Sequence, residues 1–123
     1  PPSQDIYQIF NCTYLEFCAV FIFFHFISLR LSPQVLQMNQ LSKGGITGTL
    51  VDVRLMLRRA LEVGAVSLIL AHNHPSGTLR PSQADKNLTE KLTTACSALD
   101  IKVLDHLIVT EKAYFSFADE SLL

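Results

Sequence analysis

Two histidines separated by one residue, His72 and His74, have the clearest capacity for metal chemistry in this sequence. They follow an apolar run at residues 65–71, AVSLILA, which has the length and composition of a buried β-strand. Residues i and i+2 of an extended segment point to the same side, so both imidazoles can reach one ion. The spacing alone leaves open the alternative that they are a pair of surface histidines without a ligand.

Asp85 is a candidate third ligand, because it lies in the first turn of a helix predicted to begin at Ser82. Two histidines and one carboxylate leave one coordination position open for water, which is typical of catalytic rather than structural zinc sites. Zinc lowers the pKa of its bound water to about 7, so hydroxide becomes available near neutral pH. The alternative for Asp85 is a structural role in a capping box with Ser82, at the positive end of the helix dipole.

Hydrophobic periodicity predicts an α/β chain around these residues. One helix is predicted between Asp52, its N-cap, and Gly64, which ends it. The helix that begins at Ser82 is predicted to bury an apolar face made of Leu88, Leu92, Ala95 and Leu99. The remaining predicted elements are a short helix at 3–10, a turn at 32–34, a glycine-rich loop at 43–48, and strands at 17–31, 35–41, 65–71, 103–110 and 113–117.

The composition indicates a single domain over residues 1–123, with 49% hydrophobic residues to build one core. The net charge of −1 gives no basic footprint, so we expect no strong nucleic-acid binding by this domain alone. Cys12, Cys18 and Cys96 are odd in number and widely spaced, which excludes a disulfide framework and paired zinc-binding cysteines. Free thiols of this kind are typical of a reducing compartment, so we expect a cytoplasmic protein.

An apolar run at residues 17–29, FCAVFIFFHFISL, needs to be tested against a membrane helix. Glu16 and Arg30 close it, and it is shorter than the roughly 20 residues that a spanning helix requires. Phenylalanine, valine and isoleucine dominate the run and favour a buried strand. We therefore expect no membrane association.

The stretch from His72 to Asp85 resembles the signature of the JAMM (JAB/MPN) metalloproteins. That signature is histidine-x-histidine-proline, six residues, and then serine-x-x-aspartate, and this sequence reads HNHPSGTLRPSQAD. The flanking segments SKGGITGTLVDVR, VLDHLIV and YFSFADESLL resemble the RadC-like branch in particular. The resemblance covers residues 40–123 well, whereas residues 1–39 diverge from the family.

The resemblance implies a JAB/MPN fold, which is a mixed β-sheet flanked by helices and related to the cytidine-deaminase-like architecture. It implies Zn²⁺ bound by His72, His74 and Asp85, with Ser82 steadying the water or the oxyanion. A glutamate on an early strand is the family's general acid/base, and Glu16 in LEFCAVF is the matching candidate. The alternative for Glu16 is a solvated residue at the start of a strand.

The resemblance makes a zinc-dependent metallohydrolase that cleaves a peptide or isopeptide bond in a protein substrate the leading hypothesis. The alternative is a non-catalytic metal-binding interaction module associated with DNA repair or mobile-element proteins. A metal-dependent nuclease is disfavoured, because the sequence has no second carboxylate cluster for a two-metal site.

The sequence leaves open the roles of two further histidines and of one strand edge. His106, next to Asp105, fits either a role beside the metal site or a buried core position. His25, in the divergent apolar run, fits buried structure better than a ligand role. An exposed strand edge in residues 1–39 could pair with a second copy of the chain, so a homo-oligomer is compatible with the sequence.

Overall fold

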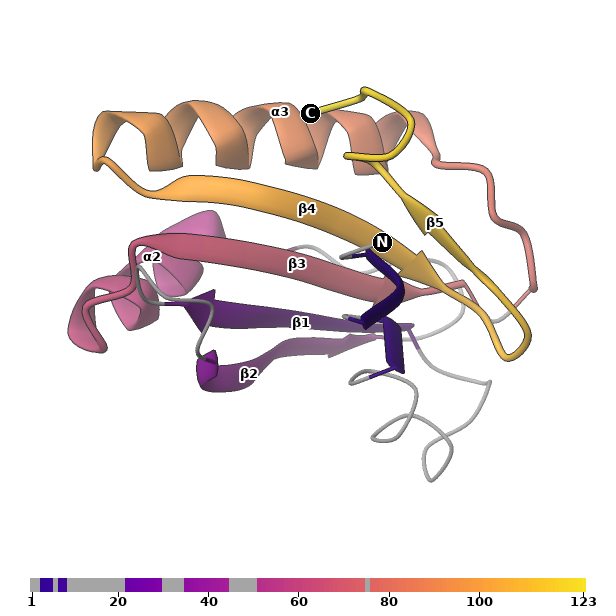
Figure 1. Cartoon of the computed structure of the whole chain (residues 1–123), viewed down its shortest axis with the longest axis horizontal. Helices are drawn as coiled ribbons and strands as arrows, with labels where there is room; N and C mark the ends of the chain where they lie inside the picture. Colours follow the sequence, from indigo (N-terminus) through magenta and orange to yellow (C-terminus); the bar gives the residue numbers. More distant parts are fainter. Residues whose placement is uncertain (1–2, 6, 9–21, 30–34, 45–50, 75) are drawn as a thin grey trace.

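The computed structural model describes residues 3–5, 7–8, 22–29, 35–44, 51–74 and 76–123. Within these ranges the strands form one five-stranded sheet in the order β2-β1-β3-β4-β5 (Figure 1). The named elements are β1 (Ile22–Leu29), β2 (Val35–Gly44), α2 (Val53–Glu62), β3 (Ser67–Asn73), α3 (Gln83–Ala98), β4 (Lys102–Val109) and β5 (Tyr114–Ser116). Residues 3–5 and 7–8, within the predicted first helix, are helical.

The sheet is mixed, as the resemblance to the JAB/MPN fold implies. β3 is its central strand, antiparallel to β1 and parallel to β4. The parallel pair is joined through α3, because parallel neighbours need a long crossover connection. β1 is hydrogen-bonded to β2 on one side and to β3 on the other. An inner strand of this kind explains why residues 22–29 are almost continuously apolar.

The sequence-based boundaries need one correction in this region. The predicted strand at 35–41 extends to Gly44, whose backbone pairs with Ile22, so Lys43 and Gly44 are strand rather than loop. Residues 17–21, 30–34 and 45–50 lie outside the described residues, and so does the predicted turn at 32–34. Among the residues that the structure describes, no helix is long and apolar enough to cross a membrane.

Helix α2 begins and ends where the sequence predicts. The Asp52 side chain accepts a hydrogen bond of 2.9 Å from the Arg54 amide, and so caps the first turn. Gly64 follows the C-cap with a φ of +70°, a conformation that glycine adopts without steric cost. The buried face of α2 packs with β3 and α3 in one core cluster, which includes Met56, Leu68, Leu70, Leu92 and Cys96.

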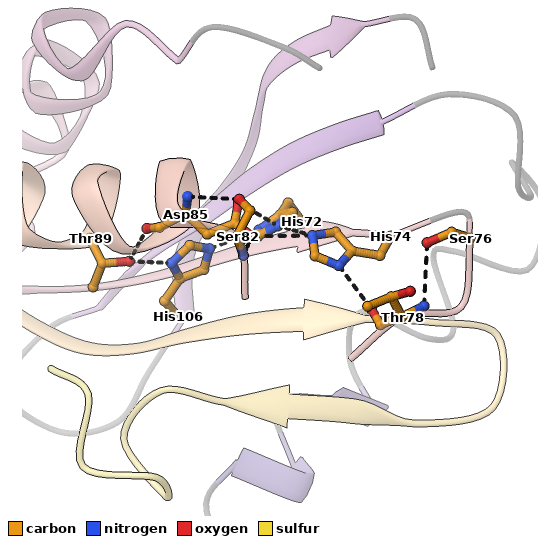
Figure 2. Close-up of polar contacts among 8 residues, drawn as sticks. All are labelled: His72, His74, Ser76, Thr78, Ser82, Asp85, Thr89 and His106. Atoms are coloured by element: carbon orange, nitrogen blue, oxygen red, sulfur yellow. Dashed lines mark hydrogen bonds and ion pairs between the residues drawn. The ribbon is translucent and has the colours of Figure 1, made fainter. Parts of the chain in front are cut away.

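Helix α3 begins after Ser82 as predicted, and its buried face is the predicted one in part. The buried positions are Asp85, Thr89, Leu92 and Cys96. Of the predicted apolar face, Leu92 is buried, Leu88 and Ala95 are partly buried and pack against the same core, and Leu99 at the C-cap is 42% exposed. The face that meets the sheet therefore carries two polar residues near its start, and these turn toward β3 and β4 (Figure 2).

One extra residue in β4 changes which side chains face α3. Leu68 pairs with Val103, whereas Ile69 pairs with Asp105, so Leu104 is a bulge residue and is 36% exposed. A bulge reverses the alternation of side chains that follow it. His106 consequently pairs with Leu70 and lies on the α3 side of the sheet.

The opposite face of the sheet has its own core. Ile69, Ala71, Leu107 and Val109 form this second cluster together with Tyr7. The ring of Tyr7 stacks on Tyr114 with centroids 4.7 Å apart. The sheet is therefore covered on one face by α2 and α3, and on the other by residues near the N-terminus (Figure 1).

Candidate metal centre

Three side chains converge where β3 ends and α3 begins (Figure 2). His72 lies in β3, His74 follows the strand, and Asp85 lies in the first turn of α3. The two Nε2 atoms of His72 and His74 are 3.0 Å apart. The carboxylate oxygens of Asp85 lie 3.2 Å from His72 Nε2 and 3.3 Å from His74 Nε2. The spacing of one residue between the histidines brings both imidazoles to one point, as an extended backbone requires.

The hydrogen bond of His74 Nδ1 shows which ring nitrogen of His74 carries a proton. His74 Nδ1 lies 2.8 Å from the carbonyl oxygen of Thr78, which accepts only, so Nδ1 carries a proton and donates it. A neutral His74 then directs an unshared electron pair from Nε2 toward the Asp85 carboxylate. Facing acceptors at this distance need a cation between them, either a proton or a metal ion.

The spacing of the three groups fits a tetrahedral metal ion. Zn–N and Zn–O bonds of about 2.0–2.1 Å give a tetrahedron whose edges are about 3.3 Å long. The two Nε2 atoms are 3.0 Å apart, Asp85 Oδ1 is 3.2 Å from His72 Nε2, and Asp85 Oδ2 is 3.3 Å from His74 Nε2. One nitrogen from each histidine and one carboxylate oxygen would therefore supply three corners of such a tetrahedron, and the fourth corner would be left for another ligand.

The charge balance of the site is consistent with this geometry. Burial alone would raise the pKa of Asp85, but hydrogen bonds with His72 and His74 outweigh it and hold that pKa far below the usual range. Burial lowers the pKa of His72. Burial also opposes a charge on His74, yet the Asp85 carboxylate raises the His74 pKa above 6.5. In the metal-free protein, the Asp85 carboxylate thus favours the protonated form of His74.

Ser82 and Asp85 also form a complete capping box. Ser82 Oγ accepts from the Asp85 amide at 3.1 Å, and the Ser82 amide donates to Asp85 Oδ2 at 2.8 Å. The capping role of Asp85 and its position beside the histidines are therefore not alternatives, because one carboxylate does both. The bond to Ser82 Oγ uses an oxygen lone pair, so the exposed hydroxyl keeps a proton that it can donate.

Behind the three convergent groups lies a buried polar layer that sequence reasoning found only in part. His106 is 0% exposed, and its Nε2 lies 2.8 Å from His72 Nδ1. Thr89 Oγ1 lies 2.6 Å from His106 Nδ1. The sequence analysis did not single out Thr89, although its spacing of four residues from Asp85 places both on one helix face. Of the two alternatives for His106, the structure places it both in the core and against His72.

Asp105 fixes the backbone around His106. Its carboxylate accepts from the His106 amide at 2.7 Å, from Ser116 Oγ at 2.6 Å and from the Ala118 amide at 3.0 Å. Burial raises the pKa of Asp105, while these hydrogen bonds oppose that effect. Burial also lowers the pKa of His106 well below 6.5, so this imidazole is neutral. The Asp105-His106 pair thus connects β4 to the turn after β5.

Two candidate residues from the sequence analysis are not placed beside this site. Glu16 lies outside the described residues, and its predicted role as acid/base stays a prediction. His25 lies in β1, where its backbone pairs with Ala71 on one side and Gln40 on the other. The two other cysteines, Cys12 and Cys18, also lie outside the described residues, whereas Cys96 is a buried free thiol.

Comparisons with known proteins show the family of this chain. The profile of the family described as "RadC-like JAB domain" matches residues 3–122. A UPF0758 protein of Flavobacterium johnsoniae is 58% identical over 99 residues, which cover 80% of this chain and 43% of that protein. A UPF0758 protein of Porphyromonas gingivalis is 48% identical over 96 residues, 77% of this chain and 42% of that protein.

The match to a third relative covers a larger share of that protein. The UPF0758 protein YfjY of Escherichia coli is 44% identical over 100 residues, which cover 81% of this chain and 62% of that protein. The chain thus spans less than half the length of the first two relatives and about three-fifths of the third.

Proposed function

The chain belongs to the RadC-like JAB domain family, and on that premise we propose that it is a zinc-dependent hydrolase of the JAMM type that cleaves a peptide or isopeptide bond. The observation that supports this proposal is the convergence of one ligand atom each from His72, His74 and Asp85 within 4.8 Å of one another, a set of three ligands that would leave a fourth position for water. A purely structural zinc site would use four protein ligands instead.

A bound Zn²⁺ would lower the pKa of a water molecule and polarise the carbonyl of the scissile bond. Ser82 would donate its hydroxyl proton to the oxygen that gains negative charge during attack. In this proposal Glu16 takes a proton from the attacking water and passes it to the leaving amine nitrogen, so one carboxylate acts first as base and then as acid.

The site offers substrate access from one side. The side chain of His72 is 1% exposed, whereas that of His74 is 17% exposed. The exposed residues Ser76, Gly77 and Thr78 lie two to four positions after His74. We therefore infer that a peptide approaches past His74 and this loop, while β4 and α3 close the site behind His72.

Zinc content and cleavage test the proposal separately. Purified protein should contain about one zinc ion per chain, and Asp85→Asn should contain none because it lacks the anionic ligand. With a peptide library as substrate, Glu16→Gln should lose cleavage and keep zinc. Glu111→Gln, a change of the same chemistry at an exposed turn, should keep both.

A matched pair of variants tests the role of Ser82. Ser82→Ala should lower cleavage with zinc content unchanged, and Ser82→Thr should restore it, because threonine keeps both the cap and the hydroxyl proton. Equal cleavage by wild-type protein and Glu16→Gln would remove Glu16 from the mechanism. Protein that binds zinc and cleaves no member of the library would instead favour the non-catalytic interaction module.

A further inference from the structure

We propose that Thr89 and His106 act together as positioning residues, which keep the proton of His72 on Nδ1 and so present its Nε2 unprotonated to the metal. This inference rests on the metal site of the proposed function. It concerns two side chains that do not touch the metal position and that belong to different elements, α3 and β4. A row of hydrogen bonds connects Thr89, His106 and His72 (Figure 2).

The donor and acceptor roles in this row of hydrogen bonds are fixed at Thr89, the end farthest from the metal position. Thr89 Oγ1 donates to the backbone carbonyl oxygen of Asp85 at 2.9 Å, and a hydroxyl has only one proton to give. Toward His106 Nδ1, 2.6 Å away, the Thr89 oxygen must therefore act as the acceptor. His106 Nδ1 consequently carries a proton.

Counting protons in the same way assigns the donor and the acceptor between His106 Nε2 and His72 Nδ1. A neutral imidazole has one N–H, so a His106 that is protonated on Nδ1 has a bare Nε2. Full burial disfavours a second proton on this ring, because that proton would make it a cation. His106 Nε2 therefore accepts from His72 Nδ1, which lies 2.8 Å away. His72 then has its own single proton on Nδ1, and its Nε2 is unprotonated where it meets His74 and Asp85.

The surroundings hold the His106 ring in the plane that this row of hydrogen bonds needs. Phe117 stacks on the ring at a centroid distance of 4.5 Å and an interplanar angle of 11°. Asp105 accepts from the His106 backbone amide at 2.7 Å. The bulge at Leu104 turns the ring to the side of the sheet where α3 carries Thr89. A ring with both nitrogens paired and one face covered has a defined tautomer as well as a defined position.

Three threonine variants separate this role from simple packing. Thr89→Val keeps the shape of the side chain but gives His106 Nδ1 no acceptor, so the tautomer is no longer fixed. Thr89→Ser restores the hydroxyl. Thr93→Val is the matched control, because Thr93 Oγ1 also donates to a backbone carbonyl one turn earlier, that of Thr89, at 2.7 Å. It removes the same kind of bond from the same helix, away from this row of hydrogen bonds.

The first measurement is the Kd for zinc, obtained by competition with a chromogenic chelator. We expect Thr89→Val to bind zinc about 10–100-fold more weakly, with Thr89→Ser and Thr93→Val within about threefold of the wild-type protein. Equal affinity of all four proteins would overturn the proposal. So would an equal loss in Thr89→Val and Thr93→Val, because that would be a general effect of destabilising α3. Urea unfolding of each metal-free variant confirms that it is folded before titration.

The second measurement reads the tautomers directly. In ¹⁵N-labelled protein, long-range ¹H–¹⁵N correlation spectra distinguish a protonated from a bare ring nitrogen. We expect His106 to be protonated on Nδ1 and bare on Nε2, with or without zinc. A proton on His106 Nε2 would reverse the row of hydrogen bonds and overturn the proposal. The two failures are distinguishable: wild-type protein that binds no zinc contradicts the proposed function, whereas a reversed His106 tautomer contradicts this inference alone.

Discussion

Replacing Asp85 by asparagine should separate the two roles of this residue. In the metal-free protein the amide oxygen can keep the bond from the Ser82 amide, now 2.8 Å long, and so preserve the start of α3. The amide NH₂, at the position of Oδ1, can donate to His72 Nε2, 3.2 Å away, while His74 Nε2 faces the amide oxygen at 3.3 Å. The variant therefore keeps the fold but loses the anionic ligand.

The expected magnitudes follow from these contacts. At a free zinc concentration 1,000 times Kd, the wild-type free energy of unfolding should rise by about 4 kcal/mol, and that of Asp85→Asn should not rise. Without metal, Asp85→Asn should stay within about 1 kcal/mol of wild type, because neutral hydrogen bonds replace the charged ones. Asp85→Ala also loses the bond to the Ser82 amide, so the metal-free variant should be less stable than wild type by about 1–2 kcal/mol.

Urea unfolding of the three proteins, with and without zinc, measures all of these quantities. Asp85→Ala is the control for the capping bond, because it removes the ligand and the cap together. The reasoning would be refuted by zinc stabilising Asp85→Asn as much as wild type. It would also be refuted if metal-free Asp85→Asn and Asp85→Ala were equally destabilised, since the amide would then not replace the carboxylate at the start of α3.

Three other predictions concern pH, β4 and α2. The His74 pKa is raised above 6.5 in the metal-free protein, so the stability that its proton provides is present below pH 6.5 and is lost above the folded-state pKa. Zinc must displace this proton, so the zinc-induced gain in unfolding free energy should grow by about 1.4 kcal/mol per pH unit up to that pKa, as urea titrations across pH will show. Asp105→Ala removes the acceptor of Ser116 Oγ and of two backbone amides, and should cost about 2–4 kcal/mol in urea unfolding. Gly64→Ala should lower the free energy of unfolding by about 1 kcal/mol through backbone strain at φ +70°. No steric clash adds to this cost, because an added Cβ meets no atom within 4 Å. A neutral result in thermal unfolding would contradict this prediction.

Local signals in the sequence were sufficient for the helix boundaries and for the candidate ligands. Asp52, Gly64 and Ser82 act at the positions where their side chains or backbone freedom predict caps. His72 and His74 lie on one side of the chain because an extended backbone points the side chains of residues i and i+2 the same way. These features depend on neighbours in the sequence, so one sequence is enough to predict them.

The polar layer behind the ligands could not be predicted in the same way. The apolar face expected for α3 missed Thr89, because a buried threonine is favoured only by partners that lie far away in the sequence. Simple alternation from Val103 places Asp105 on the α3 side of β4, whereas the bulge at Leu104 places His106 there. A bulge is fixed by pairing with β3 and has no reliable local signature.

The bulge at Leu104 also affects how related genes should be compared. Side chains of β4 alternate between the two faces of the sheet, and the bulge interrupts this alternation. Alternation counted back from Val109 assigns His106 to the correct face, whereas alternation counted forward from Val103 assigns it to the wrong face. Loss of the single codon for Leu104 would remove the bulge and leave a regular strand, in which Asp105 and His106 keep their present partners Ile69 and Leu70. In an alignment, a histidine in this column is therefore equivalent to His106 where its spacing to the valine that follows, Val109, is the same, whatever its spacing to Val103.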